Sequence, residues 1–132
     1  EKNWEELLKF SRRTQHQLDQ WAARYGYKDQ PKEILDHAKS GRHAGRYTAV
    51  NLTNADTVEF RMFRGTLKCN TLIATLELLD CIIDAAIYLT DDDLKAMSWS
   101  SFVIGCTQPE LVQYLKERRL YVNEPVESEV EV

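Results

Sequence analysis

The sequence predicts an α+β fold in which a small antiparallel β-hairpin packs on a buried central helix, with further helices around it. Residues 47–52 and 57–63 are rich in β-branched and aromatic side chains and flank a stretch with turn chemistry, which is typical of a hairpin. Residues 71–89 are apolar almost all round, as in a core helix. A chain of 132 residues is large enough for one core and too small for two, so we expect a single packed portion over residues 1–122.

The region before the hairpin predicts two helices. Asn3 followed by Glu6 has the cap-and-acid spacing of a helix start, and apolar residues then recur at helical spacing. We therefore expect one amphipathic helix over residues 4–25. Pro31 suits the first turn of a second helix, which should run to about residue 39.

Alternation along the second predicted strand separates an apolar face from a charged face. The apolar face carries Val58, Phe60 and Met62, and the other face carries Glu59, Arg61 and Phe63. We expect the apolar face to be core. Asn51 on the first strand should share the face of Glu59, because both side chains are candidates for one binding site.

The central helix predicted at 71–89 has one narrow polar stripe along an apolar surface. The stripe is formed by Glu77, Asp80 and Asp84. We expect the apolar side chains of this helix to be deeply buried. Those expected to be most buried are Leu76, Leu79, Ile83 and Ile87.

The rest of the chain predicts two short helices and a tail. Thr90 precedes three aspartates and should cap the first of these helices. Thr107 with Glu110 should open the second, which should run to Glu117. Residues 123–132 are acidic and predict a disordered tail.

The formal net charge of −4 comes from this tail. Its ten residues carry four acids and no base, and setting these four aside leaves 17 acids against 17 bases. A neutral body argues against non-specific binding to nucleic acid or to a membrane surface, because both need a net basic face. The three acids within residues 71–89 argue against a membrane span, since charge in the hydrocarbon region is costly.

The cysteines predict a reduced environment. Cys69, Cys81 and Cys106 are an odd number and form no CxxC pair. No segment has the layout of a signal peptide. We therefore expect a cytoplasmic protein.

Residues 42–68 are the segment that does not fit plain packing. Their basic side chains, among them Arg46, Arg61 and Arg64, surround one carboxylate, Glu59, and one amide, Asn51. Glu59 and Arg61 stand two residues apart on one strand face, about 6.6 Å along the strand. At this spacing a carboxylate can hold a divalent cation while a guanidinium reaches a phosphate bound to the same metal.

These residues form a pattern that resembles a known family. The pattern is Arg46-Tyr47-x-x-x-Asn51-Leu52, then Thr57-Val58-Glu59-Phe60-Arg61, then Phe63-Arg64-Gly65-Thr66-Leu67. It is similar to the C-terminal signature of phage and bacterial amidoligases, relatives of the glutamate-cysteine ligases that share their carboxylate-amine ligase fold. The resemblance is strongest over residues 45–102, which is under half of the chain.

The resemblance implies a reaction and a role for each residue. ATP phosphorylates a small-molecule or peptide carboxylate, and an amine attacks the acyl phosphate to form an amide. By position, Glu59 would be a Mg²⁺ ligand, and Arg61 and Arg64 would be catalytic. Arg46 and Asn51 would bind the nucleotide together with Arg61. Such a set agrees with phosphoryl transfer, which depends on positioning and on neutralisation by metal and arginine.

The sequence also departs from the family. It lacks the N-terminal strand with paired glutamates of the Gly-x-Glu-x-Glu kind and the histidine-bearing strand after it. Mg²⁺ held between nucleotide and protein usually needs more than one acidic ligand. We therefore expect this chain to be the C-terminal portion of an amidoligase and inactive by itself. Its first residue is Glu1 rather than Met, so we expect the chain to begin inside a longer product or after processing.

A second interpretation stays open. The chain could be a phage or mobile-element product that kept the fold, lost catalysis, and binds and inhibits a host protein complex. The absent glutamate strand favours this interpretation for the chain, whereas the intact Glu59 and Arg61 favour the enzyme for its parent. A paired-glutamate strand encoded upstream would support the enzyme.

Overall fold

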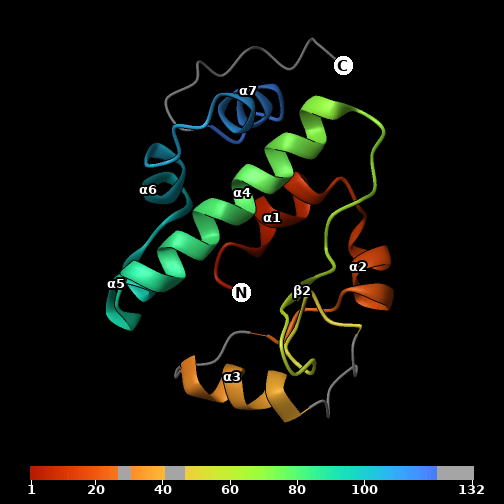
Figure 1. The fold of residues 1–132 in the computed structure, drawn as a ribbon, viewed down its shortest axis with the longest axis vertical. Coiled ribbons are helices and arrows are strands. Elements are labelled where there is room, and N and C mark those ends of the chain that lie inside the picture. Colours follow the sequence, from red (N-terminus) through yellow and green to blue (C-terminus); the bar gives the residue numbers. More distant parts are fainter. Residues whose placement is uncertain (27–30, 41–46, 122–132) are drawn as a thin grey trace. The chain divides into compact units, whose positions relative to one another are not determined.

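A computed structural model describes residues 1–26, 31–40 and 47–121 of the chain (Figure 1). These residues are mainly helical and contain one two-stranded antiparallel sheet, which confirms a mixed α+β fold in which helices dominate. The elements are α1 (Trp4–Ser11), α2 (Gln15–Trp21), α3 (Pro31–Ser40), β1 (Val50–Asn51), β2 (Glu59–Phe60), α4 (Cys69–Tyr88), α5 (Asp91–Ala96), α6 (Trp99–Ile104) and α7 (Pro109–Glu117). The tail predicted at 123–132 lies outside the described residues.

The chain divides into two compact units at the bond between Gly65 and Thr66. The first unit contains α1 to β2, and the second contains α4 to α7. No helix within the described ranges is long and apolar enough to cross a membrane.

The single helix predicted over residues 4–25 is wrong, because the chain forms α1 and α2 with a break between them. Arg12 ends α1 in the left-handed conformation, with φ 61°. Thr14 then starts α2 through a capping box, in which its hydroxyl accepts a hydrogen bond from the Gln17 backbone N–H. Such a cap satisfies backbone donors that a continuous helix would bond internally, so the local chemistry favours two helices.

The first unit has a small core formed by its helices and the hairpin region. The buried members of this core are Trp4, Leu18, Ala22, Ala49 and Met62. The indole of Trp4 donates to Gln15 Oε1 at 2.9 Å, so its polar group is satisfied inside the unit. The burial of Met62 agrees with the predicted apolar strand face, whereas Val58 is 54% exposed and was wrongly placed in the core.

The predicted hairpin is confirmed, but its strands are shorter than the sequence indicates. β1 and β2 pair antiparallel, with Val50 opposite Phe60 and Asn51 opposite Glu59. An isolated parallel bridge joins Ala23 to Thr48, so the segment after α2 extends the pairing. This support matters because an isolated two-stranded hairpin is at best marginally stable.

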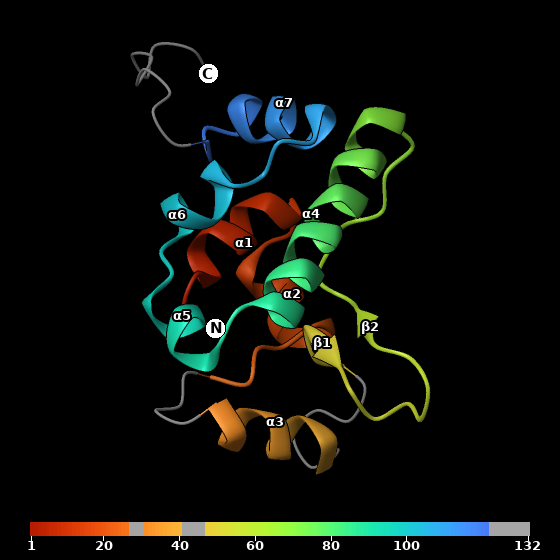
Figure 2. The same ribbon diagram turned by 60° about the vertical axis from the view of Figure 1, so that its left-hand side comes forward.

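The second unit is built on the pairing of α4 with α7, which lie side by side (Figures 1 and 2). A carboxylate oxygen of Glu77 accepts a hydrogen bond from the Leu111 backbone N–H at 2.7 Å, so α4 satisfies a free donor in the first turn of α7. Thr90 caps α5 through a capping box, as predicted. The helix α6, capped by Ser98, was not predicted.

The prediction that residues 71–89 form a buried central helix is wrong about burial, although the bounds of α4 agree closely. Its buried residues are Thr71, Ala74 and Leu78. Leu76, Ile83 and Ile87 are instead 56%, 44% and 65% exposed, and Leu79 is half-buried. Apolar residues on almost every side of this helix predicted that it would be covered on every side. Within its own unit, however, α4 packs on one side only.

Truncating Leu78 and Leu76 should have opposite consequences for stability. Leu78 is fully buried, so Leu78→Ala should lower the free energy of unfolding by about 2–5 kcal/mol. Leu76→Ala, two residues earlier on the same helix, should change it by about 0.5 kcal/mol or less. Urea denaturation monitored by circular dichroism measures both. Equal losses for the two variants would contradict the exposure of Leu76.

Two of the cysteines lie together in the second unit. Cys81 and Cys106 both line one small pocket beside α4. Burial, and next the neighbouring Cys81 thiol, raises the pKa of Cys106 to about 12. Cys69, by contrast, is exposed at the start of α4. Since the thiolate is the reactive form, Cys106 should be a poor nucleophile.

The thiols should therefore differ in their reaction with iodoacetamide at pH 8. Relative to the ordinary thiol pKa of 9.0, a pKa of about 12 lowers the Cys106 thiolate fraction at this pH by roughly a hundredfold to a thousandfold. Peptide mapping by mass spectrometry should find Cys69 alkylated well before Cys106 in the native chain. In urea the difference should vanish, and its persistence there would refute burial as the cause.

Candidate functional site

Asn51 and Glu59 occupy the same face of the hairpin, as predicted. They are directly paired across β1 and β2, which places both side chains on one side of the sheet. The Asn51 amide Nδ2 donates to Glu59 Oε1 at 3.2 Å. The first two residues of the predicted site are therefore brought together by the strand register.

Arg61 joins this pair from the end of β2. Its Nη1 donates to Glu59 Oε1 at 3.3 Å, and its Nε donates to the Trp21 carbonyl oxygen at 3.3 Å. The guanidinium also lies over the Tyr47 ring, 5.2 Å from the ring centroid, where a cation is attracted to the aromatic face. Three contacts thus fix the orientation of Arg61. Among the described residues, Nη2 has no hydrogen-bond acceptor.

Asn51 is buried beneath the site and is not accessible to solvent. Its side chain is 1% exposed, and its Oδ1 accepts from both the backbone N–H and the hydroxyl of Thr53, at 3.1 and 2.7 Å. One amide therefore fixes both the start of the turn and the carboxylate of Glu59. This arrangement favours a positioning role for Asn51.

Two arginines that were not predicted as site residues hold the segment that follows β2. Arg13 Nη1 donates to the Arg61 carbonyl at 3.0 Å, and Arg12 Nη2 donates to the Arg64 carbonyl at 2.7 Å. The Arg64 backbone N–H in turn donates to the Ser11 carbonyl at 3.1 Å. Residues at the break between α1 and α2 therefore hold this segment in place. The capping box of Thr14 was the sequence signal that could have revealed the break.

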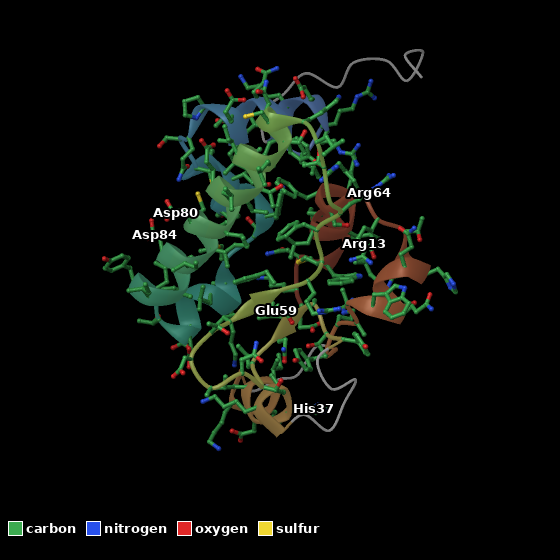
Figure 3. The ribbon with its side chains drawn as sticks, turned by 45° about the vertical axis from the view of Figure 1, so that its right-hand side comes forward. Arg13, His37, Glu59, Arg64, Asp80 and Asp84 are labelled. Carbon is green, nitrogen blue, oxygen red and sulfur yellow. The ribbon has the colours of Figure 1, made fainter. Side chains whose placement is uncertain are left out.

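Of the remaining predicted residues, Arg64 does not join the cluster. Arg64 is exposed, and Figure 3 shows it at a separate place from Glu59. Arg46 lies outside the described residues. The structure thus brings together Asn51, Glu59 and Arg61, which we call the hairpin triad.

The hairpin triad is partly open to solvent. The side chain of Glu59 is 41% exposed and that of Arg61 is 21% exposed, so their ion pair is screened and adds little to stability. Within the described part of the chain, no group of three or more His, Cys, Asp or Glu side chains is arranged to hold a metal ion. The carboxylate of the triad can bind a cation, and its guanidinium can bind an oxyanion.

Comparison with other proteins adds no assignment. No protein-family model, curated protein or solved structure matches this chain. The geometry of the hairpin triad and the sequence pattern around it are therefore the features that bear on function.

A cavity of about 350 Å³ lies in the same unit but is separate from the triad. Its lining is mostly apolar and includes Trp4, Leu7, Leu35, Val50 and Met62. Because Val50 precedes Asn51 on β1, their side chains point to opposite faces of the hairpin. The cavity and the hairpin triad therefore use different faces.

Replacing Asn51 should loosen the turn and release Glu59. Asn51→Ala removes the acceptor of two Thr53 donors, so we expect a loss of about 1–3 kcal/mol in the free energy of unfolding. Asn54→Ala, on an exposed residue of the same turn, should change it by about 0.5 kcal/mol or less. Urea melts followed by near-ultraviolet circular dichroism report both. Equal stability of the two variants would show that the Asn51 contacts are not formed in solution.

Proposed function

We propose that this chain is the C-terminal part of an ATP-dependent amidoligase, which joins a carboxylate to an amine. The observation that carries the proposal is the hairpin triad: one carboxylate and one guanidinium held together on a strand face, at the positions that resemble the amidoligase signature. Glu59 would bind Mg²⁺ and Arg61 would face the transferring phosphoryl group. This division of roles is what phosphoryl transfer requires.

The proposed reaction has two steps. A carboxylate oxygen of a small molecule or peptide attacks the γ-phosphorus of ATP, and the bond to ADP breaks. The amine nitrogen then attacks the carbonyl carbon of the acyl phosphate, and phosphate leaves as the amide forms and the amine loses a proton. ATP supplies the energy, so the natural compartment is the cytoplasm.

The contacts of Arg61 support its proposed role. Its Nε and Nη1 are engaged, whereas Nη2 has no acceptor among the described residues and could reach a phosphate oxygen. A guanidinium already oriented by Trp21 and Tyr47 would lose little conformational entropy on binding an anion. Arg64 and Arg46 would add positive charge at the substrate and nucleotide, and Asn51 would keep Glu59 in place.

The proposed enzyme needs a second half. Glu59 supplies only part of the oxygen ligands that Mg²⁺ takes, and the remaining carboxylates would come from an upstream half of the same domain. The chain by itself would then bind Mg-ATP poorly and would not turn it over.

A second candidate is a protein-binding module that inhibits a host complex, as a phage or mobile-element product could. The observation that favours it is the exposed apolar side of α4, since large exposed apolar surfaces mark interaction sites. The two candidates differ in a simple readout, because only the ligase consumes ATP.

The upstream half should convert the chain into an ATP-consuming enzyme whose activity depends on Arg61. In the extended protein, Arg61→Ala should lower kcat by about a thousandfold and change nucleotide affinity much less, because the guanidinium acts mainly on the transition state. Arg61→Lys should rescue little, since an ammonium lacks the planar fork. Glu59→Gln should weaken binding of Mg²⁺ and Mg-ATP.

Two surface variants serve as controls. Lys32→Ala removes a cation from an exposed ion pair on α3, and Glu33→Gln removes a carboxylate from the same helix. Both should leave turnover unchanged. Isothermal titration calorimetry with Mg-ATP and an ADP-release assay measure binding and turnover. Turnover by the isolated chain, or full activity of the extended Arg61→Ala protein, would place the active site elsewhere.

A further inference from the structure

The exposed side of α4 carries a continuous row of large apolar side chains. The row, which we call the α4 stripe, consists of Leu72, Leu76, Ile83 and Ile87. These positions are four, seven and four residues apart, which keeps them on one side of a helix. The half-buried Leu79 completes the spacing between Leu76 and Ile83. Such spacing is typical of a helix that packs against another helix.

The second unit does not use this stripe for its own packing. α4 packs against α7, where Glu77 accepts a hydrogen bond from Leu111, and the fully buried Ala74 and Leu78 lie on the side of α4 away from the stripe. Ile87, at the other extreme, is 65% exposed. Burial of apolar surface is favourable, so covering the exposed parts of four such side chains would drive association.

A charged border runs along one edge of the α4 stripe. Asp80 and Asp84 are exposed and lie one turn apart, and Figure 3 shows both at the outer edge of α4. Within the described residues neither carboxylate has an ion-pair or hydrogen-bond partner. An apolar row beside two unpaired carboxylates fits a partner with its own apolar row beside basic residues.

A second copy of α4 does not meet this requirement. In an antiparallel pair Leu76 would oppose Ile83 of the copy and Leu72 would oppose Ile87, which brings the two Asp80 carboxylates to the same level. Like charges at that distance are unfavourable. The helix contains no Lys or Arg between Cys69 and Tyr88, so a copy of α4 offers no base to neutralise them.

We propose that the α4 stripe is the docking surface for an amphipathic helix whose apolar row is bordered by Lys or Arg, and that the upstream half of the ligase domain supplies this helix. This inference rests on the proposed function. The proposed ligase needs such an upstream half, because Glu59 supplies only part of the oxygen ligands that Mg²⁺ takes. The apolar row beside the exposed Asp80 and Asp84 selects a helix with a basic border.

The test mixes this chain with the polypeptide encoded in frame immediately upstream. Sedimentation velocity should show a one-to-one complex, and calorimetry should give its Kd at low and high salt. The double variant Leu76→Glu/Ile83→Glu should weaken binding at least a hundredfold. Asp80→Asn/Asp84→Asn should weaken it about tenfold at low salt and flatten its salt dependence, because screening acts on the lost charge pairs.

Tyr88→Glu is the matched control. Tyr88 is 79% exposed and follows Ile87, so it lies about 100° further round the helix and outside the stripe. This variant should bind normally. All variants should fold, since the replaced side chains are exposed, and thermal melts of the chain alone check this. In a protein that contains both halves, Leu76→Glu should lower Tm, whereas in this chain alone it should not.

Several results would overturn the inference. These are an absent upstream polypeptide, no complex, a complex insensitive to Leu76→Glu/Ile83→Glu, or a dimer of this chain alone that the same variant dissolves. The last result would make a second copy the occupant. ATP turnover in the same mixtures separates the two proposals. A complex that depends on the stripe but shows no ATP turnover refutes the ligase proposal and supports the docking surface. ATP turnover that the stripe variants leave unchanged supports the ligase proposal and refutes the docking surface.

Discussion

The direct pairing of Asn51 with Glu59 is the constraint on which the rest of the first unit depends. A shift of one residue in strand register would turn Glu59 to the face of the apolar cavity and carry Met62 out of the core. Two ladder positions are too few to fix a register unaided. The buried Asn51 amide supplies the missing specificity, because its oxygen holds Thr53 and its nitrogen holds Glu59.

The helical break at Arg12 holds the segment that follows β2. Two arginines that follow each other in sequence reach carbonyl groups at Arg61 and Arg64, and a backbone bond from Arg64 returns to Ser11. These contacts hold the main chain of Arg61 while Trp21 and Tyr47 hold its side chain. Because both the backbone and the side chain of Arg61 are held, its guanidinium is pre-organised to bind an anion. Phosphoryl transfer depends on such pre-organised positive charge.

Local chemistry explains which features could be predicted from the sequence. The starts of α3 and α5 follow from Pro31 and Thr90. The shared face of Asn51 and Glu59 was expected because both side chains were candidates for one site, and the antiparallel register confirms it. The contacts of Arg12 and Arg13 join residues about fifty positions apart, and no local pattern encodes them. The exposure of α4 was not predicted for a different reason. An apolar pattern indicates that a helix surface is favourably buried, but it does not show whether the same unit provides the residues that bury it.

The bond between Glu77 and the Leu111 backbone has a consequence for how the second unit opens. A helix as short as α7 is unstable in water without external support, because its nucleation is costly. Its first turn depends on a carboxylate that belongs to α4. Fraying of α4 around Glu77 therefore removes the cap of α7, so the amide hydrogens of both helices should exchange with solvent in a single cooperative event.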